Sequence, residues 1–279
     1  MSAVPAAGTP AGTPALRLRD VGMVFGAGGP RPVTALEGID LTVAPGELVS
    51  LIGPSGCGKS TLLRLLADLL VPTSGELQVN GGTAAQARLG RRYGMVFQAA
   101  TLLDWRKVAA NVELPLVIMG VAKAERRARA LEMLRLVGLG DFADAYPWQL
   151  SGGMQQRVAI ARALAFRPAI LLMDEPFGAL DEMTRERMQA ELLQIWRDSG
   201  TTIVFVTHSI PEAVFLSTRV VVMSPRPGRI AEVVDVDLPR ERDDGTREEQ
   251  HFFELTTRVR DALRHVDALS RAAAGPAPA

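Results

Sequence analysis

Five short runs of nearly continuous apolar residues constrain the fold of this 279-residue chain more than any other feature of its sequence. Each run ends in glycine, proline or a polar residue, and the runs occupy 47–53, 93–98, 169–176, 201–208 and 219–224. A strand with one face in solvent alternates apolar and polar side chains, whereas a strand buried on both faces does not. The runs therefore predict the strands of a parallel sheet that is covered by helices.

Helical patterns separate these runs, at residues 60–70, 154–165 and 183–200. Alternation of strands and helices is typical of an α/β fold. Residues 16–43 alternate more regularly and indicate an antiparallel β layer. Residues 99–165 contain few signals for a buried strand, so we interpret them as an inserted helical subdomain.

Charge and composition narrow the classes of protein that fit. Lysine and arginine total 31 and aspartate and glutamate total 31, so no basic excess favours nucleic acid as a partner. No apolar run approaches the about 20 residues that a membrane-spanning helix needs. Residues 1–15 lack the basic and apolar regions of a secretory signal, and Cys57 is the one cysteine, which fits a reducing compartment. Proline, glycine and alanine predict disorder in 1–15 and 269–279.

A glycine-rich octapeptide, GPSGCGKS, follows the first of the five runs and matches the pattern of a phosphate-binding loop. Its glycines let main-chain N–H groups converge on an anion, and the helix that follows adds its dipole. Lys59 would neutralise the β- and γ-phosphates of ATP, and Ser60 would bind Mg²⁺. A chance glycine-rich turn is the alternative, which the preceding strand and following helix disfavour. The predicted phosphate contacts are Gly53, Pro54, Ser55, Gly56, Cys57, Gly58, Lys59, Ser60 and Thr61.

A pair of carboxylates follows another buried run, in ILLMDEP at residues 170–176. They would emerge beside the phosphate loop at the carboxyl end of the sheet, where α/β proteins bind ligands. Asp174 suits water-mediated coordination of Mg²⁺, and Glu175 suits polarisation of an attacking water. An ordinary turn at a strand end is the alternative.

A second glycine-rich segment, LSGGMQQ at residues 150–156, precedes a predicted helix. In the simplest interpretation Ser151 is an N-cap and the glycines form a loop. That interpretation explains where the helix begins. It leaves open why a chain with one phosphate loop would carry a second segment of this kind.

The motifs occur in a characteristic order: Phe25, the phosphate loop, Gln98, LSGGMQQ, ILLMDEP, GALD at 178–181 and His208. Over about residues 16–230 this order closely resembles the nucleotide-binding cassette of ATP-binding-cassette (ABC) proteins. The resemblance implies a P-loop NTPase (RecA-like) core with an antiparallel β layer and a helical subdomain at about 99–165. It also implies hydrolysis of ATP, with Mg²⁺ as the metal.

The resemblance also accounts for the second glycine-rich segment. In such cassettes two subunits meet head to tail, and each ATP lies between one phosphate loop and the signature segment of the other subunit. We therefore expect a dimer of cassettes, built from two copies of this chain. The residues that would face the partner's γ-phosphate or its surroundings are Ser151, Gly152, Gly153 and Gln155, and Asp181 would touch the opposing subunit.

Three further roles follow from the resemblance. Phe25 would stack on adenine, unless it is simply a core phenylalanine. Gln98 would contact Mg²⁺ and the attacking water. His208 would contact the γ-phosphate and hold the water, although Ser209 stands where an acidic residue is usual.

Residues 100–112, 182–189 and 219–230 resemble the ATPase subunits of nitrate, sulfonate and taurine-type importers, with Asp104 where proline is frequent. This implies a peripheral subunit at the cytoplasmic face of the membrane, beneath two permease subunits and served by an external binding protein. Thr101–Arg106 would dock on a permease helix, unless its apolar side chains fill the cassette's own core. Residues 231–268 predict a strand, a charged linker and a helix near 249–268, too short for an additional regulatory domain.

Other functions fit the same motifs less well. A different import substrate, such as a thiamine-related pyrimidine, is compatible with every motif. A soluble cassette acting in translation or DNA repair is disfavoured by the single cassette and the balanced charge. A regulatory nucleotide-binding module without turnover is disfavoured by Glu175 and His208.

Overall fold

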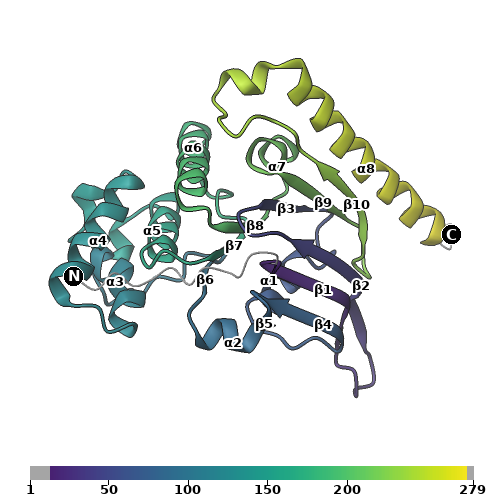
Figure 1. The fold of residues 1–279 in the computed structure, drawn as a ribbon, viewed down its shortest axis with the longest axis horizontal. Helices are drawn as coiled ribbons and strands as arrows, with labels where there is room; N and C mark the ends of the chain where they lie inside the picture. The colour runs from purple at the N-terminus through teal and green to yellow at the C-terminus, as the bar shows by residue number, and fades with distance from the viewer. Residues whose placement is uncertain (1–12, 275–279) are drawn as a thin grey trace. The chain divides into compact units, whose positions relative to one another are not determined.

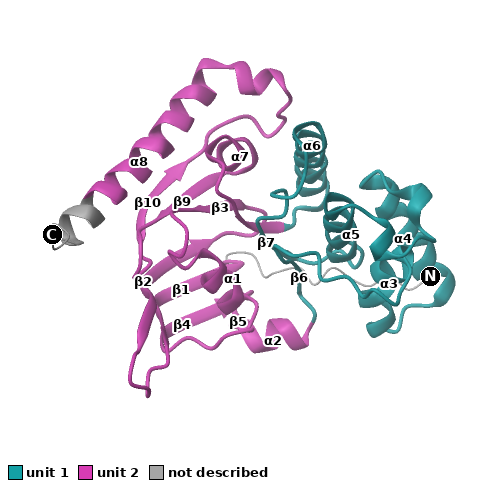
Figure 2. Cartoon of the chain, turned by 180° about the vertical axis from the view of Figure 1, so that it is seen from behind, with its two compact units in different colours: residues 1–7, 91–201 teal, residues 8–90, 202–279 magenta. Residues whose placement is uncertain are grey.

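The computed structural model describes residues 13–274, with side chains to residue 268, and the chain forms two compact units. Unit 1 contains Arg91–Thr201, and unit 2 contains the chain before and after it, up to Gly90 and from Thr202 (Figure 2). Most of the predicted disordered tails, residues 1–12 and 275–279, lies outside the described residues.

The structure describes a few residues within each predicted tail. Ala15 is buried, and its carbonyl accepts a hydrogen bond from Asn80 N at 2.8 Å. The C-terminal helix α8 (Gln250–Ala274) continues beyond its predicted end at residue 268.

Four strands of unit 2 form a mixed sheet in the order β10-β9-β3-β8 (Figure 1). Strand β3 (Leu48–Ile52) is parallel to both β8 (Thr202–Val206) and β9 (Arg219–Met223), and β10 (Ile230–Asp235) pairs antiparallel with β9 at the edge. Every residue of β3 and β8 is buried, which is why these strands show no alternation in sequence. The predicted parallel strands are confirmed.

A second sheet of unit 2 is antiparallel, in the order β2-β1-β4-β5. Strands β1 (Leu16–Phe25) and β2 (Val33–Val43) form the antiparallel layer expected from residues 16–43. Strands β4 (Ser74–Val79) and β5 (Gly82–Thr83) are not predicted from the sequence. Because β4 is mostly exposed, it lacks the apolar run that identified the other strands.

The helices of unit 2 are α1 (Lys59–Leu66), α2 (Ala84–Leu89), α7 (Ile210–Leu216) and α8. One face of α8 packs against α7, β9 and β10, as Figure 1 shows, and it buries Phe252, Leu255, Val259, Ala262 and Val266. The charged stretch before α8, which the sequence predicts as a linker, is also packed. Its Arg242 and Thr246 are only 6% and 4% exposed, and Gly245–Glu248 forms a 3-10 turn.

Unit 1 contains the parallel pair β6 (Tyr93–Val96) and β7 (Ile170–Asp174). Its helices are α3 (Val108–Ile118), α4 (Lys123–Leu136), α5 (Gly152–Leu164) and α6 (Glu182–Ser199), with 3-10 turns at Gly140–Phe142 and Pro147–Gln149. Helices α3, α4 and α5 pack on one another, and α5 also packs on β6. Among the described residues of both units, no helix is long and apolar enough to span a membrane.

Candidate functional site

The phosphate loop of unit 2 joins the carboxyl end of β3 to the first residue of α1. Gly58 caps α1 with φ 105°, a conformation that side chains other than hydrogen rarely allow. A Cβ at this position would also lie 2.6 Å from Leu36 Cδ2 and 3.1 Å from Ala35 O on β2. The loop therefore needs glycine here both for its turn and for its close packing.

Lys59 is held inside this loop, with 5% of its surface exposed. Its Nζ donates hydrogen bonds to Gly53 O at 2.8 Å and Pro54 O at 3.0 Å, and lies 3.7 Å from Cys57 Sγ. Burying an ammonium group is costly unless an opposite charge compensates it. The phosphates of ATP would supply that charge, so the loop fits the predicted ligand.

His208 occupies the corresponding position on the neighbouring strand of unit 2. Leu51 of β3 pairs with Val206 of β8, so Gly53 and His208 each follow a paired residue by two positions. Since the strands are parallel, both residues emerge at the same carboxyl edge of the sheet. His208 is exposed at this edge.

Hydrogen bonds on both sides of His208 fasten it to α7. The Thr207 hydroxyl donates to the Glu212 carboxylate, and the same hydroxyl accepts from Ser209 N at 3.0 Å. Ser209 is the N-cap of α7, and its hydroxyl accepts from Glu212 N at 3.4 Å. Serine therefore retains the capping function that an acidic residue would have here.

Phe25 ends β1 with 40% of its surface exposed. This exposure argues against the alternative that Phe25 belongs to the core. Its ring remains available for a planar ligand.

In unit 1, Gln98 and Glu175 lie together at the carboxyl ends of β6 and β7. Val96 pairs with Met173, and Gln98 Nε2 donates to Glu175 Oε2 at 3.3 Å. Glu175 has φ 47°, a left-handed conformation that a non-glycine residue adopts at a cost and that is frequent at active sites. The neighbouring Asp174 is only 4% exposed.

The signature segment forms the N-terminus of α5. Ser151 is the N-cap, as the simplest interpretation predicts, and its hydroxyl accepts from Met154 N at 3.3 Å. The same interpretation is wrong about the glycines, because Gly152 and Gly153 lie in the first turn of α5 and not in a loop. A Cβ on Gly153 would lie 3.1 Å from Ala179 O and 3.2 Å from Leu180 Cδ2, so this glycine lets the GALD segment pack closely. Nothing lies within 4 Å of a Cβ on Gly152.

Two other predicted site residues have partners within the same unit. Gln155 Nε2 donates to Pro147 O at 2.9 Å and Leu150 O at 3.3 Å, which ties the signature helix to the preceding loop. Asp181 is the N-cap of α6 and accepts from Thr184 N at 3.0 Å. That backbone hydrogen bond lowers the pKa of the Asp181 carboxyl below its usual range.

Two residues that the sequence motifs do not identify hold the loop after Gln98. Asn111, which is fully buried, accepts from Leu103 N at 2.7 Å and donates to Leu103 O at 3.1 Å. Arg162 donates to Ala100 O and Thr101 O, both at 2.9 Å, and burial lowers the pKa of its guanidinium. The sequence signal that could have identified Asn111 and Arg162 is a polar residue among the apolar residues of a predicted helix. The loop that they hold leaves Trp105 74% exposed.

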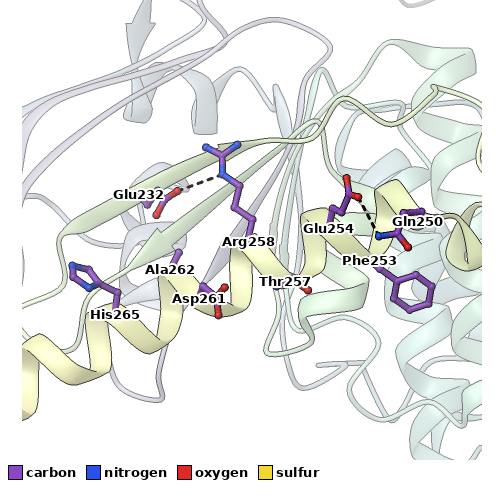
Figure 3. A pocket seen from close by; sticks show the side chains of 9 residues that line it. All are labelled: Glu232, Gln250, Phe253, Glu254, Thr257, Arg258, Asp261, Ala262 and His265. Carbon is purple, nitrogen blue, oxygen red and sulfur yellow. Dashed lines mark hydrogen bonds and ion pairs between the residues drawn. The ribbon is translucent and has the colours of Figure 1, made fainter.

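A hollow of about 620 Å³ lies away from the phosphate loop, along β10 and α8 (Figure 3). The Arg258 guanidinium in its wall pairs with Glu232 at 3.7 Å, and Gln250 Nε2 donates to Glu254 at 3.1 Å. Arg258 and Glu232 thus pair with each other in the wall, whereas Asp261 pairs with Arg264 outside it. The hollow contains none of the predicted nucleotide contacts.

Comparison with known proteins identifies the family. Residues 36–178, just over half of the chain, match the family model described as ABC transporter. This chain belongs to the ABC transporter family. The cassette is 48% identical to the uncharacterized ABC transporter ATP-binding protein MJ0412 of Methanocaldococcus jannaschii, over 89% of this chain and 91% of that protein. It is 46% identical to the taurine import ATP-binding protein TauB of Rhizobium johnstonii, over 92% of this chain and 100% of that protein.

A solved structure supports the same assignment of this ABC cassette. The ATP-binding cassette MJ0796, as a dimer bound to ADP and Pi, superposes with a TM-score of 0.74 and 36% identity. The match covers 80% of this chain and 100% of that chain. The predicted family and the predicted P-loop α/β fold are both confirmed. The chain is an ABC ATP-binding subunit, an ATPase coupled to transport.

Proposed function

We propose that this cassette energises uptake of a small sulfonate-type anion, such as taurine, through a partner permease. The observation that carries the ATPase chemistry is the Glu175 carboxylate at the end of β7, with Gln98 Nε2 3.3 Å away. The match to the taurine import protein along its full length supports the substrate class. Both parts of the proposal can be tested separately.

The phosphate loop would bind the triphosphate of ATP. Lys59 would turn from the carbonyls of Gly53 and Pro54 toward the β- and γ-phosphates. Its hydrogen bonds to neutral carbonyls would then be replaced by stronger hydrogen bonds to anionic oxygens. The main-chain N–H groups of Ser60 and Thr61, in the first turn of α1, would donate to the same anion. Phe25 would stack on the adenine ring with its exposed face.

Ser60, Gln98 and Asp174 would hold Mg²⁺, since hydroxyl, amide and carboxylate oxygens are the hard ligands it prefers. When bound, the metal would neutralise charge that develops on the phosphates. Asp174 fits this role because the residue is only 4% exposed, and burial of an anionic group favours a cation as partner.

Glu175 would orient and deprotonate the attacking water, and Gln98 would fix the direction of that carboxylate. His208 would donate to the γ-phosphate from the end of β8. Its main-chain position is set by the hydrogen bonds of Thr207 and Ser209. These residues would bind and position the reactants, which is the main task of a protein in phosphoryl transfer.

Two copies of the chain would share each ATP. Ser151, Gly152 and Gly153 would face the γ-phosphate held by the other copy, because Ser151 and Gly152 are exposed at the N-terminus of α5. Gln155 would support this segment from behind through Pro147 and Leu150, and Asp181 would contact the partner. The dimeric structure of the cassette MJ0796 supports this arrangement.

The loop that carries Trp105 would contact the permease, at the cytoplasmic face of the membrane. Asn111 and Arg162 hold the loop while leaving the indole 74% exposed, and exposed tryptophans commonly anchor interfaces. Two permease subunits and an external binding protein would complete the system.

Reconstitution tests the proposal. The chain, the permease encoded with it and the binding protein are placed in liposomes with ATP on the cassette side, and uptake of labelled taurine is measured beside ATP hydrolysis. We expect hydrolysis that taurine-loaded binding protein stimulates, and no uptake with Glu175→Gln. If binding protein loaded with nitrate or with a pyrimidine stimulated hydrolysis and taurine did not, the proposed substrate class would be wrong. Absence of hydrolysis by the wild-type assembly would contradict the ATPase role.

A further inference from the structure

The stretch that precedes α8 contains a buried arginine that is fastened to the end of α7. The guanidinium of Arg242 donates to Phe215 O at 2.7 Å and Ser217 O at 2.9 Å, with Val214 O further away at 3.4 Å. It also donates to Pro239 O at 2.7 Å within its own loop. The carbonyls of Val214, Phe215 and Ser217 belong to the C-terminal end of α7, where main-chain acceptors lack partners within the helix.

An arginine suits this position for two reasons. Its planar fork carries five N–H donors, so one side chain can satisfy several carbonyls in different directions. Its charge interacts favourably with the negative end of the helix dipole. Burial lowers the pKa of the Arg242 guanidinium to about 10, which still leaves it protonated at neutral pH.

The other end of α7 holds His208. The helix has 7 residues, Ile210–Leu216, so its two ends move together. Glu212 in its first turn accepts from the Thr207 hydroxyl, and its N–H donates to Ser209 at 3.4 Å. Thr207 and Ser209 are the two neighbours of His208. A shift of α7 therefore shifts the main chain on both sides of the imidazole.

Three more contacts fix α7 and its C-cap to the rest of unit 2. The Arg247 guanidinium lies over the Phe215 ring, 3.6 Å from its centroid, and α8 packs on α7. The Ser217 hydroxyl meets that of Ser50 on β3, the strand that leads into the phosphate loop. The end of α7 thus joins the C-terminal extension to the central strand.

We infer that Arg242 is a positioning residue for His208 and acts through α7, so that the C-terminal extension sets the geometry of the hydrolytic site. The inference rests on the proposed role of His208 in ATP hydrolysis. Arg242 acts without touching the nucleotide, because every partner named above is a main-chain carbonyl of α7, Ser217 or its own loop.

Arg242→Met tests this, because methionine keeps an unbranched apolar side chain and removes the donors and the charge. We expect kcat for ATP to fall about tenfold to a hundredfold, the loss typical of a displaced catalytic group, while KM changes less than twofold. For Arg242→Lys, which keeps the charge and one donor group, we expect a kcat between those of the wild type and Arg242→Met. Arg240→Met, at an exposed position of the same loop, should match the wild type.

A readout that does not depend on turnover separates this inference from the proposed function. The full chain has 3 histidines, so imidazole NMR signals can be assigned with His251→Gln and His265→Gln. Arg242→Met should shift the His208 signals, and Arg240→Met should not. In a His208→Gln background Arg242→Met should cost no further activity, because the group that it positions is gone.

Several results would overturn the inference: unchanged His208 signals, unchanged kcat, or an equal loss with and without His208. If Arg242→Met does not fold, as judged by thermal unfolding, the same comparisons are made with Arg242→Lys. A wild-type chain without ATPase activity would contradict the proposed function instead. A shift of the His208 signals would still show that Arg242 sets its position.

Discussion

Gln98 Nε2 lies 3.3 Å from Glu175 Oε2, and the two residues occupy equivalent positions beyond the paired ends of β6 and β7. The amide can hold the carboxylate in one orientation without removing its charge. Glu175 also has a left-handed φ of 47°, so its backbone departs from the extended conformation of β7. A carboxylate held in one orientation at a strand end is suited to act on water.

Glu175→Gln should therefore abolish most hydrolysis while preserving ATP affinity. The substitution retains the shape of the side chain and removes the base, whose contribution is typically about 10²–10⁴-fold. Steady-state phosphate release and binding of a fluorescent ATP analogue measure the two effects. Turnover near the wild-type rate would exclude Glu175 as the base.

Trp105→Ala should weaken assembly with the permease and leave ATP binding by the isolated chain intact. The indole is 74% exposed, so its removal leaves no cavity in the cassette. Truncation of an aromatic anchor at an interface commonly costs about 2 kcal/mol or more. Co-purification with the permease and ATP titration of the isolated subunit provide the two measurements.

Asn111→Leu is the contrasting substitution for this loop. Its amide is fully buried and satisfies Leu103 N and O, so the variant should lose thermal stability as well as permease binding. If Trp105→Ala also unfolded the chain, its side chain would have a core function after all.

Mixed dimers test whether two copies share each ATP, with Glu175→Gln as background so that bound ATP is retained. Lys59→Ala damages the phosphate loop, and Ser151→Arg obstructs the signature segment, so each homodimer should fail. In a mixed dimer both lesions fall on one site and the other site is intact. Retained nucleotide, measured with dimer mass across mixing ratios, should reach one ATP per mixed dimer. Mixed dimers that form and retain no ATP would contradict sharing.

The His251–Asp237 pair should make stability depend on pH. His251 Nε2 lies 2.6 Å from Asp237 Oδ1, and this hydrogen bond raises the pKa of His251 and lowers that of Asp237. The histidine contribution is complete below its ordinary pKa of 6.5 and is lost as pH rises through the raised folded value. The carboxylate contribution is present above 3.8 and is lost as pH falls through the lowered folded value.

Thermal unfolding of wild type and His251→Gln should therefore differ most between pH 3.8 and 6.5, and the difference should shrink in alkaline solution. The effect is small because both side chains are exposed and solvent screens them. High salt should reduce it further. A difference that grows with pH above neutrality would contradict the assigned direction.

Local sequence patterns were sufficient for most of the fold. The strands β3, β7 and β8 are buried along their whole length, so their apolar runs are visible without any knowledge of their neighbours. The exposed strand β4 is held in place by its pairing with β1. Its own side chains show no apolar pattern that would predict a strand. Its existence is therefore a property of the sheet rather than of residues 74–79.

For the candidate site, the residue types that phosphate chemistry requires can be identified from the sequence alone, in GPSGCGKS, LSGGMQQ and ILLMDEP. Such motifs can be recognised in a sequence because a phosphate loop, an N-cap and a strand end each depend on a few consecutive residues. The supporting contacts become visible only in the folded chain: Arg242 with the end of α7, Asn111 with the loop that carries Trp105, and Gln98 with Glu175. These contacts join segments that are distant in sequence. Their partners are mostly main-chain groups, which every residue possesses, so no residue type at the other end of the contact signals them in advance.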